Sequence, residues 1–245
     1  MTDIYGNLPL MERIFERADV TKRLMRGDFF VCTGNYIHST GSIDDSAEVA
    51  DNLMHLRQRF PRNAFILLGS HEWSHVANVP IVKDGVNQTQ AFVNLLEKKV
   101  GITVDAKIRE YTKFWAASPL AVTAANIFIS HAAPDRSVRK IDDFRAINIS
   151  SIKKRNDPYY GLLWAQPKSL GNLDSMAAPY DGIDTENFLE NLNVKVSLVG
   201  HSPVSKALQL RRQVIVNTAA KGEYLDIDLS RQYTAAELMK CVKTA

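Results

Sequence analysis

Short apolar segments that end in polar loops are the feature that most constrains the fold of this chain. Residues 29–32, 65–68, 127–130 and 194–199 are mostly apolar, and each run is closed by Gly, His, Asn or Ser. Runs of this length that are rich in Phe, Ile, Val and Leu predict buried strands. Loops at strand ends are where α/β proteins bind their ligands. We therefore expect an α/β protein whose functional residues lie in such loops.

Amphipathic segments alternate with these strands and predict helices. One stripe of apolar residues spans 8–24, and a second spans 49–60 and ends just before Pro61. The remaining elements that we expect are helices at 89–99 and 105–115 and strands at 121–123, 207–210, 214–216 and 224–229. No internal repeat or Gly/Ser linker interrupts the pattern, which favours a single domain over residues 1–245.

Composition and charge exclude several classes of protein. With 45% apolar and 23% charged residues in 245, the chain can bury a core, so disorder and collagen are excluded. The net charge is only +3 and basic runs are short, so we expect no nucleic-acid partner. No apolar run approaches the roughly 18 residues of a membrane span, and no export leader is recognisable. Cys32 and Cys241 lack Cys-x-x-Cys spacing, which favours free thiols and a cytoplasmic protein.

Histidines gather in the polar loops. Five of the six histidines lie in or beside them, at positions 38, 71, 75, 131 and 201. Histidine is a general acid or base and a metal ligand, so its concentration at strand ends marks a candidate site. The loops are Thr2-Asp3-Ile4-Tyr5-Gly6-Asn7, Gly34-Asn35-Tyr36-Ile37-His38-Ser39, Gly69-Ser70-His71-Glu72-Trp73, Ser130-His131-Ala132-Ala133-Pro134 and Gly200-His201-Ser202-Pro203.

In order and spacing, these loops resemble the motifs of the calcineurin-like metallophosphoesterases, in particular the bacterial branch of the serine/threonine phosphoprotein phosphatases. That family carries Gly-Asp-x-His-Gly, Gly-Asp-x-x-Asp-Arg-Gly, Gly-Asn-His-Glu, a strand-ending His and Gly-His-Thr/Ser-Pro. Residues 161–167 and 217–222 also resemble family segments. The resemblance implies a four-layer αββα sandwich, with two mixed sheets flanked by helices and the site at its loop-bearing edge.

The same resemblance implies a two-cation centre, and this chain departs from its ligand set. Two divalent ions about 3.5–4 Å apart polarise the phosphate and activate water. They repel each other strongly, so a bridging carboxylate is needed to keep both in place. Asn35 stands where the family has that bridging Asp, and a neutral amide contributes no charge. Of the six implied ligands, Asp3, His131 and His201 match, while Tyr5 replaces a His and Ser70 replaces an Asn.

Residues beyond the implied ligands also differ. His71 matches the general acid of the family, but His38 replaces the Asp that would orient it. We expect an imidazole at position 38 to lower the pKa of His71 rather than raise it. Two positions that bind phosphate through Arg in the family are Ser39 and Gln166 here.

The start of the sequence leaves a question about the fold. The family has a short apolar strand before its first loop, whereas Met1 lies only two residues before Asp3. We therefore expect the first strand to be missing. Either the natural start lies upstream, or the N-terminus is shortened and Asp3 does not reach the site.

Several residues have two interpretations. His131 and His201 are either metal ligands or hydrogen-bonded core histidines, and with His71 and either Asn35 or His38 they would suit a single zinc ion.

Tyr5 is either a phenolate ligand or, as we favour, an aromatic side chain that fills the vacated space. Trp73 and Trp164 are better explained as packed walls than as ligand-stacking groups. Ser39 and Ser70 lack the Gly-x-Ser-x-Gly context of a nucleophile.

The sequence thus predicts a pseudophosphatase that binds or regulates and holds no cofactor. Its partner would be a protein or a phosphorylated ligand, and a homo-oligomer is possible. The first alternative is a weak phosphoesterase with one divalent metal, Zn or Mn. The second is a structural subunit, which an apolar patch at the place of the first strand would favour. We expect no membrane association.

Overall fold

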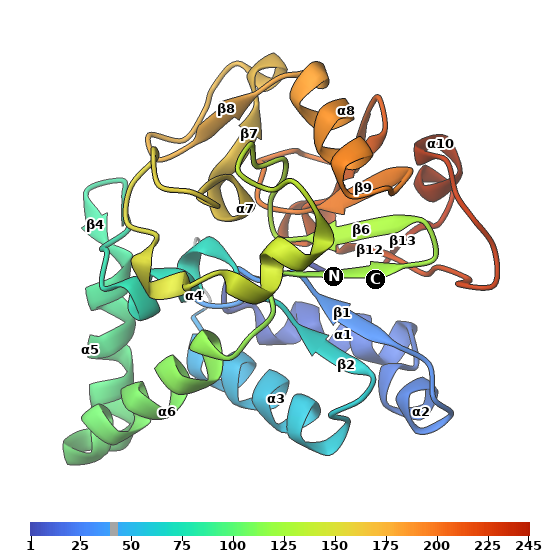
Figure 1. Ribbon diagram of the computed structural model, residues 1–245. Helices are drawn as coiled ribbons and strands as arrows, with labels where there is room; N and C mark the ends of the chain where they lie inside the picture. The colour runs from blue at the N-terminus through green and yellow to red at the C-terminus, as the bar shows by residue number, and fades with distance from the viewer. Residues whose placement is uncertain (40–43) are drawn as a thin grey trace.

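Residues 1–39 and 44–245 are described by a computed structural model, in which helices enclose a central mixed sheet (Figure 1). The expected mixed α/β fold is confirmed. The N-terminal half contains α1 (Leu8–Arg17), α2 (Val20–Met25), β1 (Phe30–Cys32), α3 (Ser46–Arg59), β2 (Ala64–Ile66), α4 (Ser70–Ala77), the β3–β4 hairpin (Val82–Lys83, Val86–Asn87), α5 (Gln88–Val100) and α6 (Val104–Ala116). The C-terminal half contains β5 (Ala121–Ala124), β6 (Ile127–Ser130), α7 (Gly161–Trp164), β7 (Ala165–Pro167), β8 (Ala178–Tyr180), α8 (Gly182–Asn191), β9 (Val196–Val199), β10 (Leu208–Leu210), β11 (Gln213–Ile215), α9 (Thr218–Lys221), β12 (Glu223–Leu225), α10 (Ala235–Met239) and β13 (Val242–Thr244).

Two sets of parallel strands position the polar loops. β1 and β2 are parallel, with Cys32 opposite Ile66. The second sheet has the order β10-β11-β9-β6-β5, and its central strands β6 and β9 are parallel, with Ser130 opposite Val199. Because parallel strands end at the same edge, the loops after β1 and β2 meet, and so do those after β6 and β9.

Burial explains why the short strands form. β6 and β9 are buried along their whole length, in accord with their nearly continuous apolar sequence. The main core fills the space between the sheets and the helices, and Trp73, Trp115 and Trp164 are among its largest fully buried side chains. Trp73 also donates its indole N–H to the carbonyl of Ile152. The interpretation of Trp73 and Trp164 as packed walls agrees with this burial.

Three expectations about secondary structure were wrong in detail. The stripe over 8–24 is two helices, because Asp19 takes a left-handed conformation (φ 51°) between them. The strand expected over 224–229 ends at Leu225. The polar residues that follow Gly69 form the first turns of α4 rather than a loop, with Gly69 as its N-cap.

The first three residues run beside β1 although no strand is assigned there. The Met1 ammonium donates to the carbonyl of Val31 at 3.0 Å, and Thr33 N–H donates to the carbonyl of Met1 at 3.0 Å. Asp3 N–H then donates to the carbonyl of Gly34. Of the two alternatives for the start of the sequence, these contacts contradict the one in which Asp3 does not reach the site, since backbone pairing with β1 carries Asp3 there.

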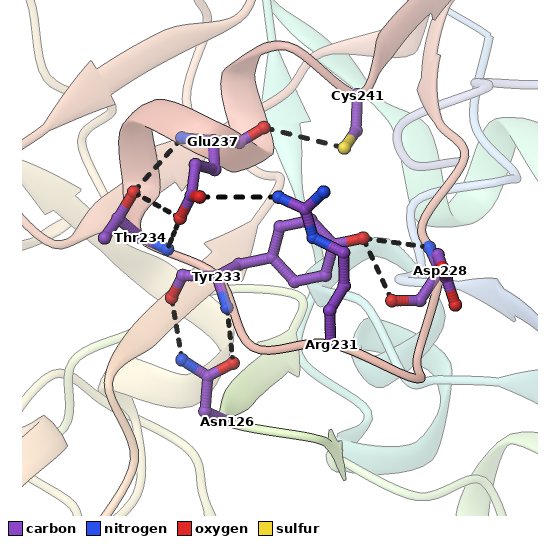
Figure 2. Close-up of polar contacts among 7 residues, drawn as sticks. All are labelled: Asn126, Asp228, Arg231, Tyr233, Thr234, Glu237 and Cys241. Carbon is purple, nitrogen blue, oxygen red and sulfur yellow. Dashed lines mark hydrogen bonds and ion pairs between the residues drawn. The ribbon is translucent and has the colours of Figure 1, made fainter.

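The C-terminal segment is fastened to the β5–β6 hairpin by Asn126 (Figure 2). The side-chain amide of Asn126 donates to the carbonyl of Tyr233 and accepts from Tyr233 N–H, at 2.7 and 2.9 Å. The Tyr233 hydroxyl donates to the carbonyl of Asp228 and accepts its N–H, which fixes the chain after β12 (Figure 2). Thr234 and Glu237 form a capping box that begins α10.

Both cysteines are free thiols, with Cys32 buried and Cys241 partly buried. Over the ranges 1–39 and 44–245, none of the helices has the length and apolar character to cross a membrane.

Candidate functional site

The carboxylate of Asp3 lies at the centre of the loops and is 1% exposed. It accepts hydrogen bonds from the Thr2 hydroxyl, from the Tyr5 hydroxyl at 3.2 Å and from His201 N–H at 3.0 Å. The last contact joins residues 198 positions apart in the sequence. Asp3 therefore connects the N-terminal segment to the loop after β9.

Asn35 links three loops through both ends of its side-chain amide. Its Oδ1 accepts from the Ser70 hydroxyl at 3.2 Å and from His71 N–H at 3.0 Å. Its Nδ2 donates to the Tyr5 hydroxyl at 3.3 Å. Because that hydroxyl in turn donates to Asp3, the side chains form a continuous chain from Asp3 through Tyr5 to Asn35.

His131 and His201 meet with their ring centroids 4.9 Å apart. His131 Nδ1 lies 3.0 Å from the carbonyl of Thr33, and its Nε2 lies 3.3 Å from the Ser70 hydroxyl. The amide of Gln166 donates to His201 Nε2 at 3.4 Å. Each of these imidazoles is therefore engaged by neighbouring protein groups.

His71 packs between Tyr5 and His38, with ring centroids 5.2 and 5.0 Å away. His38 in turn lies 2.9 Å, Nε2 to Nε2, from His75. The buried Nδ1 atoms of His38, His71 and His201 have no hydrogen-bond partner within the described residues. Ser39 is half-buried and immediately precedes residues 40–43, which lie outside the described part of the chain.

Sequence reasoning missed Glu72 as a functional residue, although its carboxylate holds the backbone of the site loops in place. It is fully buried, and its carboxylate accepts the backbone N–H groups of Asn35, Tyr36, Ile37 and Gly69 at 2.9–3.2 Å. Four donors on one carboxylate fix the loop after β1 against the start of α4. His75 was also missed as the partner of His38. Glu72 matches the final Glu of the Gly-Asn-His-Glu motif, and that match was the available signal. The contact of His75 with His38 has no local signal, because it joins separate parts of the chain.

Burial sets the protonation states in the site. It is the largest cause that lowers the pKa of His71 to about 3 and of His201 to about 4, and it holds the pKa of His38 and His131 well below the ordinary value. The direction expected for His71 is found, but burial rather than His38 is its main cause. Burial also raises the pKa of Asp3 to about 6. At neutral pH the histidines are therefore neutral.

Burial raises the pKa of Tyr5 well above its ordinary value, so the phenol keeps its proton at neutral pH. The same cause raises the pKa of Glu72 to about 7.

Five site residues hold a left-handed backbone conformation that side chains disfavour. They are Asp3, Tyr5, Asn35, His38 and His201, with φ between 48° and 63°. Asp, Asn and His tolerate this region better than most residues, whereas an aromatic residue such as Tyr5 is unusual there. Strain of this kind, of order 1–3 kcal/mol per residue, persists where the surrounding structure imposes it and is typical of functional loops.

The arrangement offers neutral hydrogen-bonding groups around the carboxylate of Asp3, while the second carboxylate, Glu72, is bound to backbone N–H groups. In the part of the chain that the structure describes, no group of three or more His, Cys, Asp or Glu side chains is placed to hold a metal ion. Chemically, the cluster can accept and donate hydrogen bonds, and Asp3 can exchange a proton near pH 6.

Comparisons with known proteins place the chain in a family. A family model described as calcineurin-like phosphoesterase matches residues 1–205. A serine/threonine phosphatase from Saccharomyces cerevisiae with similarity to human phosphatase PP5 has a similar structure, with 18% identity, a TM-score of 0.67 and 89% of this chain covered. This chain spans 65% of the length of that protein.

A cold-active protein-tyrosine phosphatase of a psychrophilic Shewanella species is similar in structure at 13% identity and a TM-score of 0.56, covering 90% of this chain and 70% of its own. At these identities the likeness concerns the fold. None of the curated proteins matches the chain. The family model, together with a fold that brings the five loops to one place, means that this chain belongs to the calcineurin-like phosphoesterase family.

Proposed function

We propose that this chain is a pseudophosphatase, a phosphoesterase-fold protein that binds or regulates without hydrolysing phosphate esters. The observation that carries the proposal is the hydrogen-bonded chain from Asp3 through the Tyr5 hydroxyl to the Asn35 amide. It puts two hydrogen-bond donors, the Tyr5 hydroxyl and the Asn35 amide N–H, where the resemblance implies ligands for divalent cations.

The chemistry of the donor set argues against a two-cation centre. Hard divalent cations prefer anionic oxygens, and a pair of them needs a bridging negative charge. Asp3 is the one carboxylate among the implied ligands, and its oxygens already accept three hydrogen bonds. The Asn35 oxygen accepts two more. These residues do not fit the pair of ions that the family uses.

The proton state of His71 also supports the proposal. A general acid works best when its pKa lies near the operating pH. Burial lowers the pKa of His71 to about 3, so at neutral pH it holds no spare proton for a leaving group.

The two arginines that bind phosphate in the family are replaced by Ser39 and Gln166 in this chain. Gln166, at a position of an implied arginine, is held by His201 and by Asp174 N–H. Removing a donor that stabilises charge in the transition state typically costs a few kcal/mol. These side chains are therefore better suited to hydrogen bonding with a neutral group or a protein segment than to turnover.

Elemental analysis of untagged protein, purified without chelator and then loaded with Mn²⁺ or Zn²⁺, tests the proposal. We expect near-zero metal per chain and no hydrolysis of p-nitrophenyl phosphate. Two equivalents of metal would refute the argument from the missing bridge. A matched variant, Tyr5→His with Asn35→Asp and Ser70→Asn, should gain metal if these positions are the ancestral ligands.

A second candidate function is a slow phosphoesterase with one metal ion. It is favoured by the proximity of the neutral His131 and His201 rings, because neutral imidazole is a good zinc ligand. One equivalent of zinc in the same analysis, lost together with activity in His131→Ala, would replace the first proposal by this one.

A further inference from the structure

Gln166 is buried beside His201, and its side-chain amide has a defined orientation. Asp174 N–H donates to Gln166 Oε1 at 2.9 Å, so this oxygen points toward the loop between β7 and β8. The Nε2 atom at the other end of the amide lies 3.4 Å from His201 Nε2. The reverse orientation would put the amide NH₂ group against Asp174 N–H and leave both without an acceptor. Gln166 therefore presents a donor to His201.

The groups that orient Gln166 are held by contacts of their own. Asp174 Oδ1 accepts the N–H of Met176 at 2.8 Å, and the Asp174 carbonyl accepts the N–H of Ala177 at 2.9 Å. Gln166 lies in β7, opposite Pro179 of the parallel strand β8. The position of the Asp174 N–H and that of Gln166 are thus fixed by backbone contacts that do not involve His201.

The Gln166 donor decides which nitrogen of His201 carries the proton. A neutral imidazole has one N–H donor and one acceptor nitrogen. Because Nε2 of His201 faces the N–H of Gln166, Nε2 is the acceptor and the proton lies on Nδ1. With the other tautomer, two N–H groups would face each other. The buried Nδ1 has no hydrogen-bond partner in the described part of the chain, so no second contact there favours the other tautomer.

Neither nitrogen of His201 then offers a free lone pair to a metal ion. Metal ions bind an unprotonated nitrogen of imidazole. The lone pair of Nε2 accepts from Gln166, and Nδ1 carries the proton. In a charged imidazolium both nitrogens carry protons, so that form has no free lone pair either.

His131 differs from His201 in this respect. Its Nδ1 lies 3.0 Å from the carbonyl of Thr33, which can only accept, so Nδ1 carries the proton and Nε2 keeps its lone pair. The Ser70 hydroxyl lies 3.3 Å from that Nε2, and it can turn its hydrogen to Asn35 Oδ1 at 3.2 Å instead. His201 is therefore the histidine that limits a metal site formed by both rings.

We propose that Gln166 is a positioning residue that fixes the tautomer of His201 and thereby leaves this histidine without a lone pair for a metal ion. The inference rests on the proposed function, since it names a residue that keeps the site free of metal. In Gln166→Glu, the atom that faces His201 becomes an oxygen that accepts. The proton of His201 should then move to Nε2, and a carboxylate that accepts from a ligating histidine also strengthens metal binding.

Nitrogen NMR of the full chain tests the tautomer directly. Long-range proton–nitrogen correlation spectra of a sample with ¹⁵N-labelled histidine, recorded with chelator at pH 7.5, distinguish protonated from unprotonated ring nitrogens. The His201 signals are assigned by their loss in His201→Gln. We expect the proton on Nδ1 of His201 in the wild-type chain and on Nε2 in Gln166→Glu. Asn172→Asp, which adds the same charge at an exposed position, is the matched control and should keep the wild-type tautomer.

Zinc titration supplies a second readout. The background is the variant that carries Tyr5→His, Asn35→Asp and Ser70→Asn. Adding Gln166→Glu to this variant should tighten zinc binding at least tenfold, whereas adding Asn172→Asp should not.

A proton on Nε2 of His201 in the wild-type chain would overturn the inference, and so would the same zinc affinity with and without Gln166→Glu. If Gln166→Glu fails to fold, the wild-type spectrum still decides. Two equivalents of metal in the wild-type chain would refute the proposed function. A metal-free wild-type chain with the proton on Nε2 of His201 would overturn this inference alone.

Discussion

Replacing Asn35 by Asp tests whether the site has become a metal-free hydrogen-bonded cluster. The Asp3 and Asn35 side chains are joined through one hydroxyl oxygen by hydrogen bonds of 3.2 and 3.3 Å, so their ends are at most about 6.5 Å apart. A second carboxylate at that distance would repel the first by about 2.5 kcal/mol at an effective dielectric constant of 20. The Ser70 hydroxyl and His71 N–H that donate to this position are neutral, so no positive charge in the cluster offsets that repulsion when a cation is absent.

We expect Asn35→Asp to lower the unfolding free energy by about 2.5 kcal/mol at pH 8, or the melting temperature by roughly 5–10 °C for a domain of this size. The penalty should shrink at pH 5, where Asp3, with a pKa of about 6, is mostly protonated. For a carboxyl group whose pKa is raised by folding, the cost is present above the folded pKa and absent below the unfolded one.

Urea unfolding in the presence of chelator measures the penalty of Asn35→Asp at pH 8 and at pH 5. At each pH the wild-type unfolding free energy is subtracted, which removes the pH dependence that the two proteins share. Asn172→Asp, on an exposed turn, is the matched control and should change little. Equal stability of Asn35→Asp and wild type at pH 8, or a penalty that does not change with pH, would refute the reasoning. Stabilisation of Asn35→Asp alone by Mn²⁺ would revive a metal centre.

Three further predictions follow from the site. Glu72→Gln should lower the unfolding free energy by about 2–6 kcal/mol, because an amide oxygen cannot accept four N–H groups and leaves two of them unsatisfied. Thermal melts measure the loss, and Glu12→Gln, at an exposed position, is the control. Burial lowers the pKa of His75 to about 4, so the contribution of this neutral side chain to stability is present above pH 6.5 and is lost as the pH falls toward 4. His75→Phe should therefore reduce the loss of unfolding free energy between pH 7.5 and 5 by about 2 kcal/mol. An unchanged dependence of the unfolding free energy on pH, measured by urea unfolding, would contradict this. Tyr5→Phe removes a donor to Asp3 and should raise the pKa of that carboxyl further above 6, as measured by carbon NMR of the carboxyl group; a lower value would show that the hydroxyl does not stabilise the carboxylate.

Most elements were predictable because their signals are local. α3 ends at Arg59, just before Pro61, and β6 spans the expected residues 127–130. These boundaries follow from the spacing of apolar residues and from the position of proline, and both signals are contained in one short stretch of sequence. The break at Asp19 was not predictable, because the apolar stripe continues across it.

The site also has features that local sequence predicts and features that only long-range contacts decide. The order of the loops and the identities of Asp3, Asn35, His131 and His201 can be read from the sequence, since each follows or faces a strand end. The contacts of these residues cannot be read from the sequence, because each contact joins segments that are far apart in the chain.

The sequence by itself therefore determined the family, the strand-and-loop order and the departure from the ligand pattern, because these are properties of residue type and spacing. Tertiary structure decided that Asp3 reaches His201, that Tyr5 donates to Asp3, and that Glu72 holds the loop after β1. It also decided the charges, since only packing removes the water that would otherwise keep the histidines near their ordinary pKa. Burial and long-range contacts arise only when all these segments share one core.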